Sequence, residues 1–238
     1  MANMPTAREP DKTDGALVAQ VKGGGEIERL RGGGPGVRQR LVVFADYACP
    51  YCYLADTSLA RLRRERGIDV DAAAFELRPS GTPLPAPDEP WLLEEWQRVV
   101  QPLADRLGVP MRLPSFSTRT RKAHEAVAYA REHGAFPAMH EAIFRAWWRH
   151  GRDIGRIDVL MEIGSSVGLD PMALRVALDI DQWAGRVEQD AATARRLGLT
   201  GVPAYLRYVE ADDGAAADVE LRVGLQEHDE LTTWVTVE

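Results

Sequence analysis

The sequence predicts an α/β fold in which a long run of helices interrupts a β-sheet. A strand, a helix and a second strand are expected over residues 41–77, helical periodicity follows from about residue 89, and alternating hydrophobic residues return at about residue 204. The chain has 238 residues, of which 45% are hydrophobic. That is enough for one large core with a sizeable insertion.

The first strand is expected at Leu41 to Phe44, a short apolar run with β-branched residues. Leu54 to Leu62 has the pattern of a helix, and Gly67 is suited to end it because glycine adopts the left-handed conformation without strain. Ile68 to Leu77 has the composition of a second strand. This order of elements is a βαβ unit. Before it, residues 1–38 are expected to be a flexible tail or small hairpin, because glycine runs interrupt them, with Ala16 to Val21 as a candidate edge strand.

Helical spacing dominates residues 83–197, which we assign to a helical insertion after a proline-rich loop. Pro102 is expected to kink or split the first helix, and Asp170 is a candidate N-cap. The expected helices cover residues 91–107, 121–133, 136–149, 158–167, 171–178 and 182–197. A hairpin of residues 204–209 and 217–223, joined through Asp212 to Gly214, completes the sheet. Residues 39–82 and 198–238 therefore form the α/β domain.

The only two cysteines lie together in Cys49-Pro50-Tyr51-Cys52, between the first strand and its helix. The free N–H groups of a helix N-terminus favour a thiolate, the form that attacks disulfides. We therefore predict that Cys49 is the nucleophile and that Cys52, one turn further in and more buried, resolves the mixed disulfide. Two alternatives remain, half of a structural zinc site without its other ligands and a pair of inert buried thiols.

Composition and charge narrow the classes of partner. The net charge of −7 gives no electrostatic reason to expect nucleic acid or an anionic membrane. The N-terminal residues contain no apolar segment, and no apolar run approaches membrane-spanning length. We expect a cytoplasmic protein. In a reducing compartment, paired cysteines are more often catalytic than structural.

Three features together resemble the thioredoxin-fold oxidoreductases of the DsbA superfamily: the motif Asp46 to Tyr53, the helical insertion, and Thr200 to Pro203. The similarity covers about residues 40–225 and is greatest to the FrnE-like branch, which includes the 2-hydroxychromene-2-carboxylate isomerases. It implies a thioredoxin fold with an inserted all-α helical subdomain. It also implies that the Val202–Pro203 peptide bond is cis and lies beside the dithiol.

The resemblance also implies how the site works. Cys49 and Cys52 would be the catalytic residues, and their redox-active disulfide would be the only cofactor, with glutathione as a candidate co-substrate. Substrates would be disulfide-containing proteins or small-molecule thiols, with no metal. The substrate contacts would come from Pro50, Tyr51, Val202 and Pro203.

Two functions remain open, with a non-catalytic binding module as a lesser third. One is thiol–disulfide exchange, and the other is glutathione-dependent isomerisation or transfer. Relatives with the second chemistry generally have serine where this chain has Cys49, so the dithiol favours exchange. Leu41 to Phe44 lacks the carboxylate that many thioredoxin-fold proteins bury near the second cysteine. The proton of Cys52 is therefore expected to leave to water or to another group.

The insertion is expected to cap the dithiol and to form an apolar cleft facing Cys49, Tyr51 and Pro203. Trp147 and Trp148 are adjacent, so they cannot share one face of a helix. One of them is a candidate lining residue for this cleft, and a core position is the alternative. His124 and His140 are expected at surface positions or with satisfied partners.

Overall fold

A five-stranded mixed sheet forms the centre of the protein in a computed structural model, which describes residues 19–20, 39–210 and 216–235. The strand order is β1-β5-β4-β2-β3. The strands are β1 (Ala19–Gln20), β2 (Gln39–Ala45), β3 (Asp69–Ala74), β4 (Ala204–Glu210) and β5 (Ala216–Val223). The predicted α/β class is confirmed, and β1 falls within the candidate edge strand. The predictions for the rest of residues 1–38 and for Asp212 to Gly214 lie outside the described residues.

Strand β2 runs parallel to β3 and antiparallel to β4. The crossover from β2 to β3 is α2 (Pro50–Arg66), which ends at Gly67 with a left-handed φ of 65°, as predicted. Phe44 near the end of β2 pairs with Ala204 at the start of β4. The beginning of α2 and the segment that enters β4 therefore meet at one edge of the sheet.

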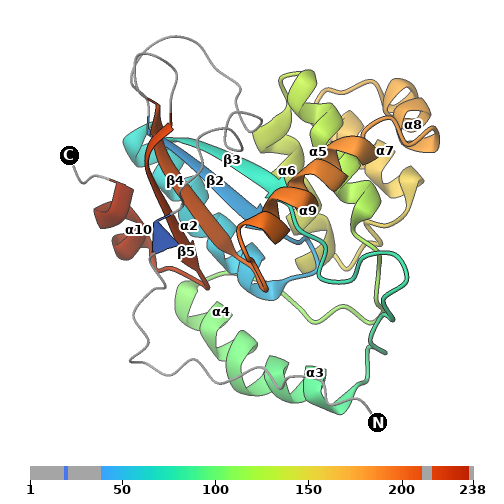
Figure 1. Cartoon of the computed structure of the whole chain (residues 1–238). Helices are drawn as coiled ribbons and strands as arrows, with labels where there is room; N and C mark the ends of the chain where they lie inside the picture. The colour runs from blue at the N-terminus through green and yellow to red at the C-terminus, as the bar shows by residue number, and fades with distance from the viewer. Residues whose placement is uncertain (1–18, 21–38, 211–215, 236–238) are drawn as a thin grey trace.

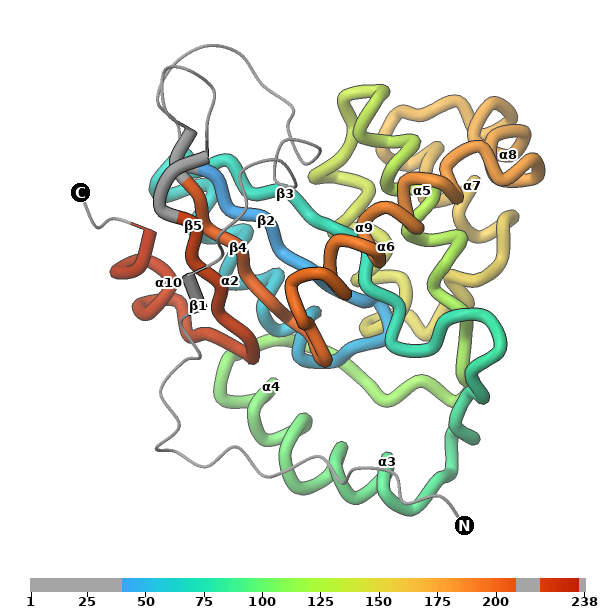
Figure 2. Tube along the Cα trace, in the orientation of Figure 1, coloured from blue at the N-terminus to red at the C-terminus, as the bar shows by residue number. Residues whose placement is uncertain are grey.

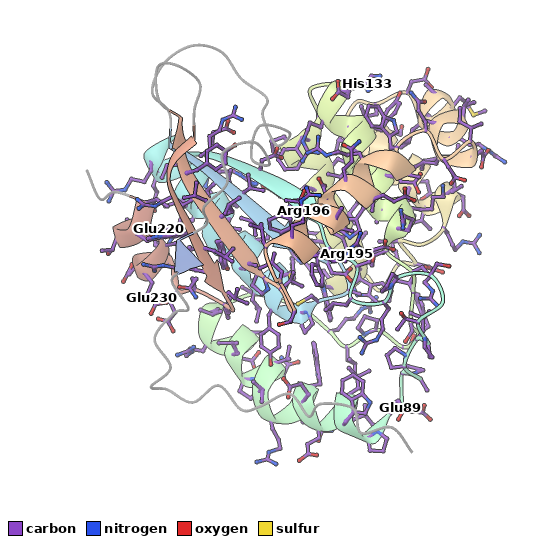
Figure 3. The ribbon with its side chains drawn as sticks, viewed as in Figure 1. Glu89, His133, Arg195, Arg196, Glu220 and Glu230 are labelled. Carbon is purple, nitrogen blue, oxygen red and sulfur yellow. The ribbon has the colours of Figure 1, made fainter. Side chains whose placement is uncertain are left out.

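Helices cover both faces of the sheet, which makes three layers (Figure 1). Leu41 and Val43 pack with α2 and with α10 (His228–Val235), whereas Val42 and Phe44 pack towards α9 (Ala184–Arg196). The sequence analysis did not anticipate α10. Glu220 of β5, labelled in Figure 3, accepts hydrogen bonds from the Trp234 indole of α10 and from Arg207 of β4.

The remaining helices lie between β3 and β4 in the chain. They are α3 (Pro90–Glu95), the π-helix η2 (Trp96–Val100), α4 (Gln101–Leu107), α5 (Arg121–Glu132), α6 (Phe136–Trp148), α7 (Ile157–Ser166) and α8 (Pro171–Asp179). Helices α5 to α8 form one group, and α3 and α4 lie apart from it (Figure 2). Asp170 caps α8 by accepting the Met172 and Ala173 N–H groups at 2.8 and 3.2 Å, as predicted. No helix within the described ranges is long and apolar enough to cross a membrane.

Pro102 marks the change from η2 to α4. A proline within a helix has no N–H to donate and crowds the carbonyl of the preceding turn. Here the wider π-turn, in which the Gln101 N–H reaches the Trp96 carbonyl, comes directly before it. The three segments α3, η2 and α4 thus run on as one continuous stretch, which we call the arm (residues 90–107). The predicted interruption is a local π-turn rather than a break.

Candidate active site

The dithiol lies where β2 passes into α2. Cys49 is the N-cap of α2, with extended backbone angles of φ −87° and ψ 117°, and its sulfur accepts the Cys52 N–H at 3.4 Å. Pro50 is the first helical residue, where a missing N–H costs nothing. The free N–H groups of this first turn stabilise negative charge on the Cys49 sulfur.

The segment before β4 closes the other side of Cys49. The Val202–Pro203 peptide bond is cis, as the resemblance implies. The Cys49 thiol donates to the Val202 carbonyl at 3.6 Å, although the two residues are 153 positions apart. The structure thus brings Cys49, Cys52 and Val202 together, and Pro203, the next residue in the chain, is buried.

Burial and its neighbour Cys49 set the electrostatic surroundings of the Cys52 thiol. Both thiols are buried, with 2% and 3% of their surface exposed. Burial raises the pKa of Cys52 well above its ordinary value, and the hydrogen bond with Cys49 and the charge of Cys49 raise it further. Cys52 therefore holds its proton more tightly than an ordinary thiol does. A buried thiol of this kind, one turn into the helix, fits the resolving role.

A buried carboxylate close to the dithiol comes from the loop after β2. Asp46 is 1% exposed, and its carboxylate accepts the N–H groups of Ala48 at 3.1 Å and Leu77 at 2.6 Å. Burial raises the pKa of Asp46, although its hydrogen bonds act in the opposite direction. The charge of Asp46 also helps to raise the pKa of Cys52. The strand Leu41 to Phe44 itself contains no carboxylate, as predicted, and the chain supplies one two residues later.

Two histidines lie buried near the dithiol, so the surface alternative is wrong for both, whereas the alternative of a satisfied partner is correct for His140. The Tyr47 hydroxyl is 2.7 Å from His140 Nδ1, and His140 Nε2 is 3.4 Å from Asp56 Oδ1. His124 Nε2 lies 3.9 Å from Asp46 Oδ1. Burial lowers the pKa of His124 to about 3, so this ring is neutral at physiological pH. Both histidines contact the Tyr47 ring, which packs them into the core.

The tryptophans of α6 do not line an open cleft. Trp147 and Trp148 are 4% and 3% exposed, so the core position is correct for both and the predicted lining role is wrong. The Trp148 indole donates to the Tyr47 carbonyl at 2.9 Å and stacks on Trp96 of the arm with ring centroids 6.3 Å apart. The Tyr51 hydroxyl donates to the Glu95 carboxylate, also on the arm.

The zinc alternative gains no support from the site. Across residues 19–20, 39–210 and 216–235, no group of three or more His, Cys, Asp or Glu side chains is arranged to hold a metal ion.

The DSBA-like thioredoxin domain matches residues 40–228. The chain belongs to this family. It is 29% identical over 168 residues to an uncharacterized protein, YwbO, of Bacillus subtilis (strain 168), across 69% of this chain and 84% of that protein. Members of the DSBA-like family are disulfide oxidoreductases or isomerases, so the predicted enzyme class is confirmed at that level.

Solved structures of other proteins share the fold. The probable DsbA oxidoreductase SCO1869 from Streptomyces coelicolor is 24% identical, with a TM-score of 0.64 over 84% of this chain and 89% of that one. A 2-hydroxychromene-2-carboxylate isomerase is 18% identical, with a TM-score of 0.65 over 82% of this chain and 92% of that one. The fold of this chain therefore resembles the folds of these two proteins to a similar degree.

Proposed function

We propose that this DSBA-like protein is a thiol–disulfide oxidoreductase that exchanges disulfides through Cys49 and Cys52. One observation carries the proposal: Cys49 caps α2 and faces the Val202 carbonyl, while the Cys52 N–H donates to its sulfur. Its substrates are disulfides of proteins or small molecules, with glutathione as a candidate thiol. Its compartment is the cytoplasm, where reducing thiols return the pair to the dithiol form.

The reaction has two exchange steps. The Cys49 thiolate attacks one sulfur of a substrate disulfide, the substrate S–S bond breaks, and the leaving thiolate takes up a proton. Cys52 then loses its proton and attacks the Cys49 sulfur, which releases the second substrate thiolate and forms the Cys49–Cys52 disulfide. The substrate gains two electrons and the dithiol loses two. The same steps in reverse oxidise a substrate dithiol.

The surrounding residues position the reacting atoms. The Val202 carbonyl beside Cys49 is a backbone acceptor for an extended substrate chain, in the manner of strand addition. Pro50 and Tyr51 separate the two cysteines along the first turn of α2. The Cys52 thiol close to Cys49 favours exchange over glutathione-dependent isomerisation, because a resolving thiol has a part only in the first reaction.

Turnover with a matched serine variant tests the proposal. Reduction of insulin, or of a small dye-linked disulfide, should proceed with excess reductant and should fall to the uncatalysed rate in Cys49→Ser. Serine is a good N-cap, so this variant keeps the start of α2 intact. Wild-type turnover in Cys49→Ser, at an unchanged denaturation midpoint, would show that exchange does not run through Cys49.

A further inference from the structure

The arm lies beside the end of α2 that carries the dithiol, away from the group formed by α5 to α8 (Figures 1 and 2). Glu89, the residue before α3, marks the outer end of the arm in Figure 3. Helix α4 leads back towards the β-sheet. The arm therefore lies on the dithiol side of the protein (Figures 1 and 2).

The arm is held by a narrow apolar contact. Of residues 90–107, Val100 and Ala104 alone are fully buried, and α3 has no buried residue. A helix that belongs to a core usually buries a broader stripe of about three residues in every two turns. Trp96 adds its stack on Trp148. An exposed ion pair between Arg106 and Glu227, with 3.3 Å between its atoms, contributes little.

One polar contact ties this lightly held arm directly to the dithiol turn. The hydroxyl of Tyr51, the residue between the two cysteines, donates to the Glu95 carboxylate. Burial and the neighbouring Glu95 both raise the pKa of Tyr51, so the hydroxyl keeps the proton that it donates. Hydrogen bonds to a carboxylate are stronger than those between neutral groups. The bond joins the end of α3 to the residue next to Cys52.

Cys49 is 3% exposed, and it belongs to the same apolar cluster as Ala104 and Trp96 of the arm. A bulky disulfide can therefore reach its sulfur only if residues of this cluster move. We propose that the Tyr51–Glu95 hydrogen bond is a latch that keeps the arm over the dithiol. Glu95 is then a specificity-determining residue that favours small disulfides over those held within folded proteins. This inference rests on the proposed exchange reaction, whose substrate range the latch would set.

Access to Cys49 can be measured without turnover. In a Cys52→Ser background Cys49 is the only thiol of the chain. Its rate constants are measured with two methanethiosulfonate reagents, one with a methyl group and one with a poly(ethylene glycol) chain. The ratio of the two rates removes any change in the intrinsic reactivity of the sulfur. Tyr51→Phe should raise the ratio of bulky to small reagent by about tenfold, as expected for loss of one charge-assisted hydrogen bond.

A second variant, on the arm, breaks the same hydrogen bond without changing Tyr51. Glu95→Met keeps the length and helix propensity of the side chain and removes the acceptor, so it should raise the ratio equally. The double variant should match either single one, because both break the same bond. Glu94→Met is the matched control, since Glu94 pairs with Arg98 on the exposed side of the arm at 2.7 Å. It should leave the ratio unchanged.

An unchanged ratio in both Tyr51→Phe and Glu95→Met would overturn the latch, as would an equal rise in Glu94→Met. Neither result bears on the exchange reaction, because labelling of Cys49 requires no catalytic cycle. Conversely, turnover that persists in Cys49→Ser would contradict disulfide exchange through Cys49, whatever the ratio of labelling rates is. The two proposals can therefore fail separately.

Discussion

His124 gives the core behind the dithiol a specific dependence on pH. Burial is the main reason that its pKa falls to about 3, and the charges of His140 and Arg121 add to the effect. In the unfolded chain the ring titrates near the ordinary value of 6.5. Between these two values the unfolded state binds the extra proton and the folded state does not. Stability from the neutral ring is therefore complete above pH 6.5 and is lost as the pH falls towards 3.

The size of the loss follows from the two pKa values. At pH 7 the unfolded ring is mostly neutral, so the linked free energy is small. A pH of 5 lies about 1.5 units below the pKa of the ring in the unfolded chain. This difference corresponds to about 2 kcal/mol of destabilisation of the folded state. Buried carboxyl groups such as Glu125 and Asp190 have raised pKa values and act in the opposite direction. The contribution of His124 must therefore be isolated by substitution.

Urea denaturation at pH 7 and at pH 5, with and without His124, measures the contribution of this ring to the free energy of unfolding. We expect the wild-type free energy of unfolding to fall by about 2 kcal/mol more than that of His124→Gln over this interval. His133→Gln is the matched control, because His133 is exposed on the surface (Figure 3) and should behave as the wild type does. Equal losses in wild type and His124→Gln would refute the assignment of a buried neutral ring.

Two further predictions concern residues next to the dithiol. Trp148→Phe should lower the free energy of unfolding by about 1–3 kcal/mol in urea, because it leaves the buried Tyr47 carbonyl without its donor. Trp147→Phe should cost less, since it removes a buried indole N–H that has no hydrogen-bond partner among the described residues, and equal losses would contradict this difference. The step in which Cys52 displaces a small thiol from Cys49 should accelerate about tenfold per pH unit near neutrality, because burial raises the Cys52 pKa. A rate that does not depend on pH in rapid-mixing experiments would contradict a raised pKa for the Cys52 thiol.

Local patterns were sufficient for much of the fold. The strand before Cys49 and the helix after it could be predicted because a short apolar run changes there to helical spacing. Gly67 and Asp170 ended and began helices as predicted, since caps depend on backbone geometry within a few residues. The position of Val202 beside Cys49 was predicted from the family resemblance and not from periodicity.

Features that depend on distant contacts could not be predicted. A single histidine has the same local pattern on a surface as in a core, so the burial of His124 and His140 against Tyr47 left no signal. The bond from Tyr51 to Glu95 crosses 44 residues and the proline-rich loop. Asp46 could have been identified, since it lies within the motif, had the search for a carboxylate continued past the end of the strand.

Trapping of the mixed disulfide tests the central claim most directly, namely that Cys49 attacks and Cys52 resolves. Each protein is reduced, treated with oxidised glutathione, quenched in acid and analysed by peptide mass spectrometry. We expect the Cys49–Cys52 disulfide in wild type, a glutathione adduct on Cys49 in Cys52→Ser, and an essentially unmodified Cys52 in Cys49→Ser. An adduct on Cys52 that forms in Cys49→Ser as fast as the Cys49 adduct forms in Cys52→Ser would contradict the assigned roles.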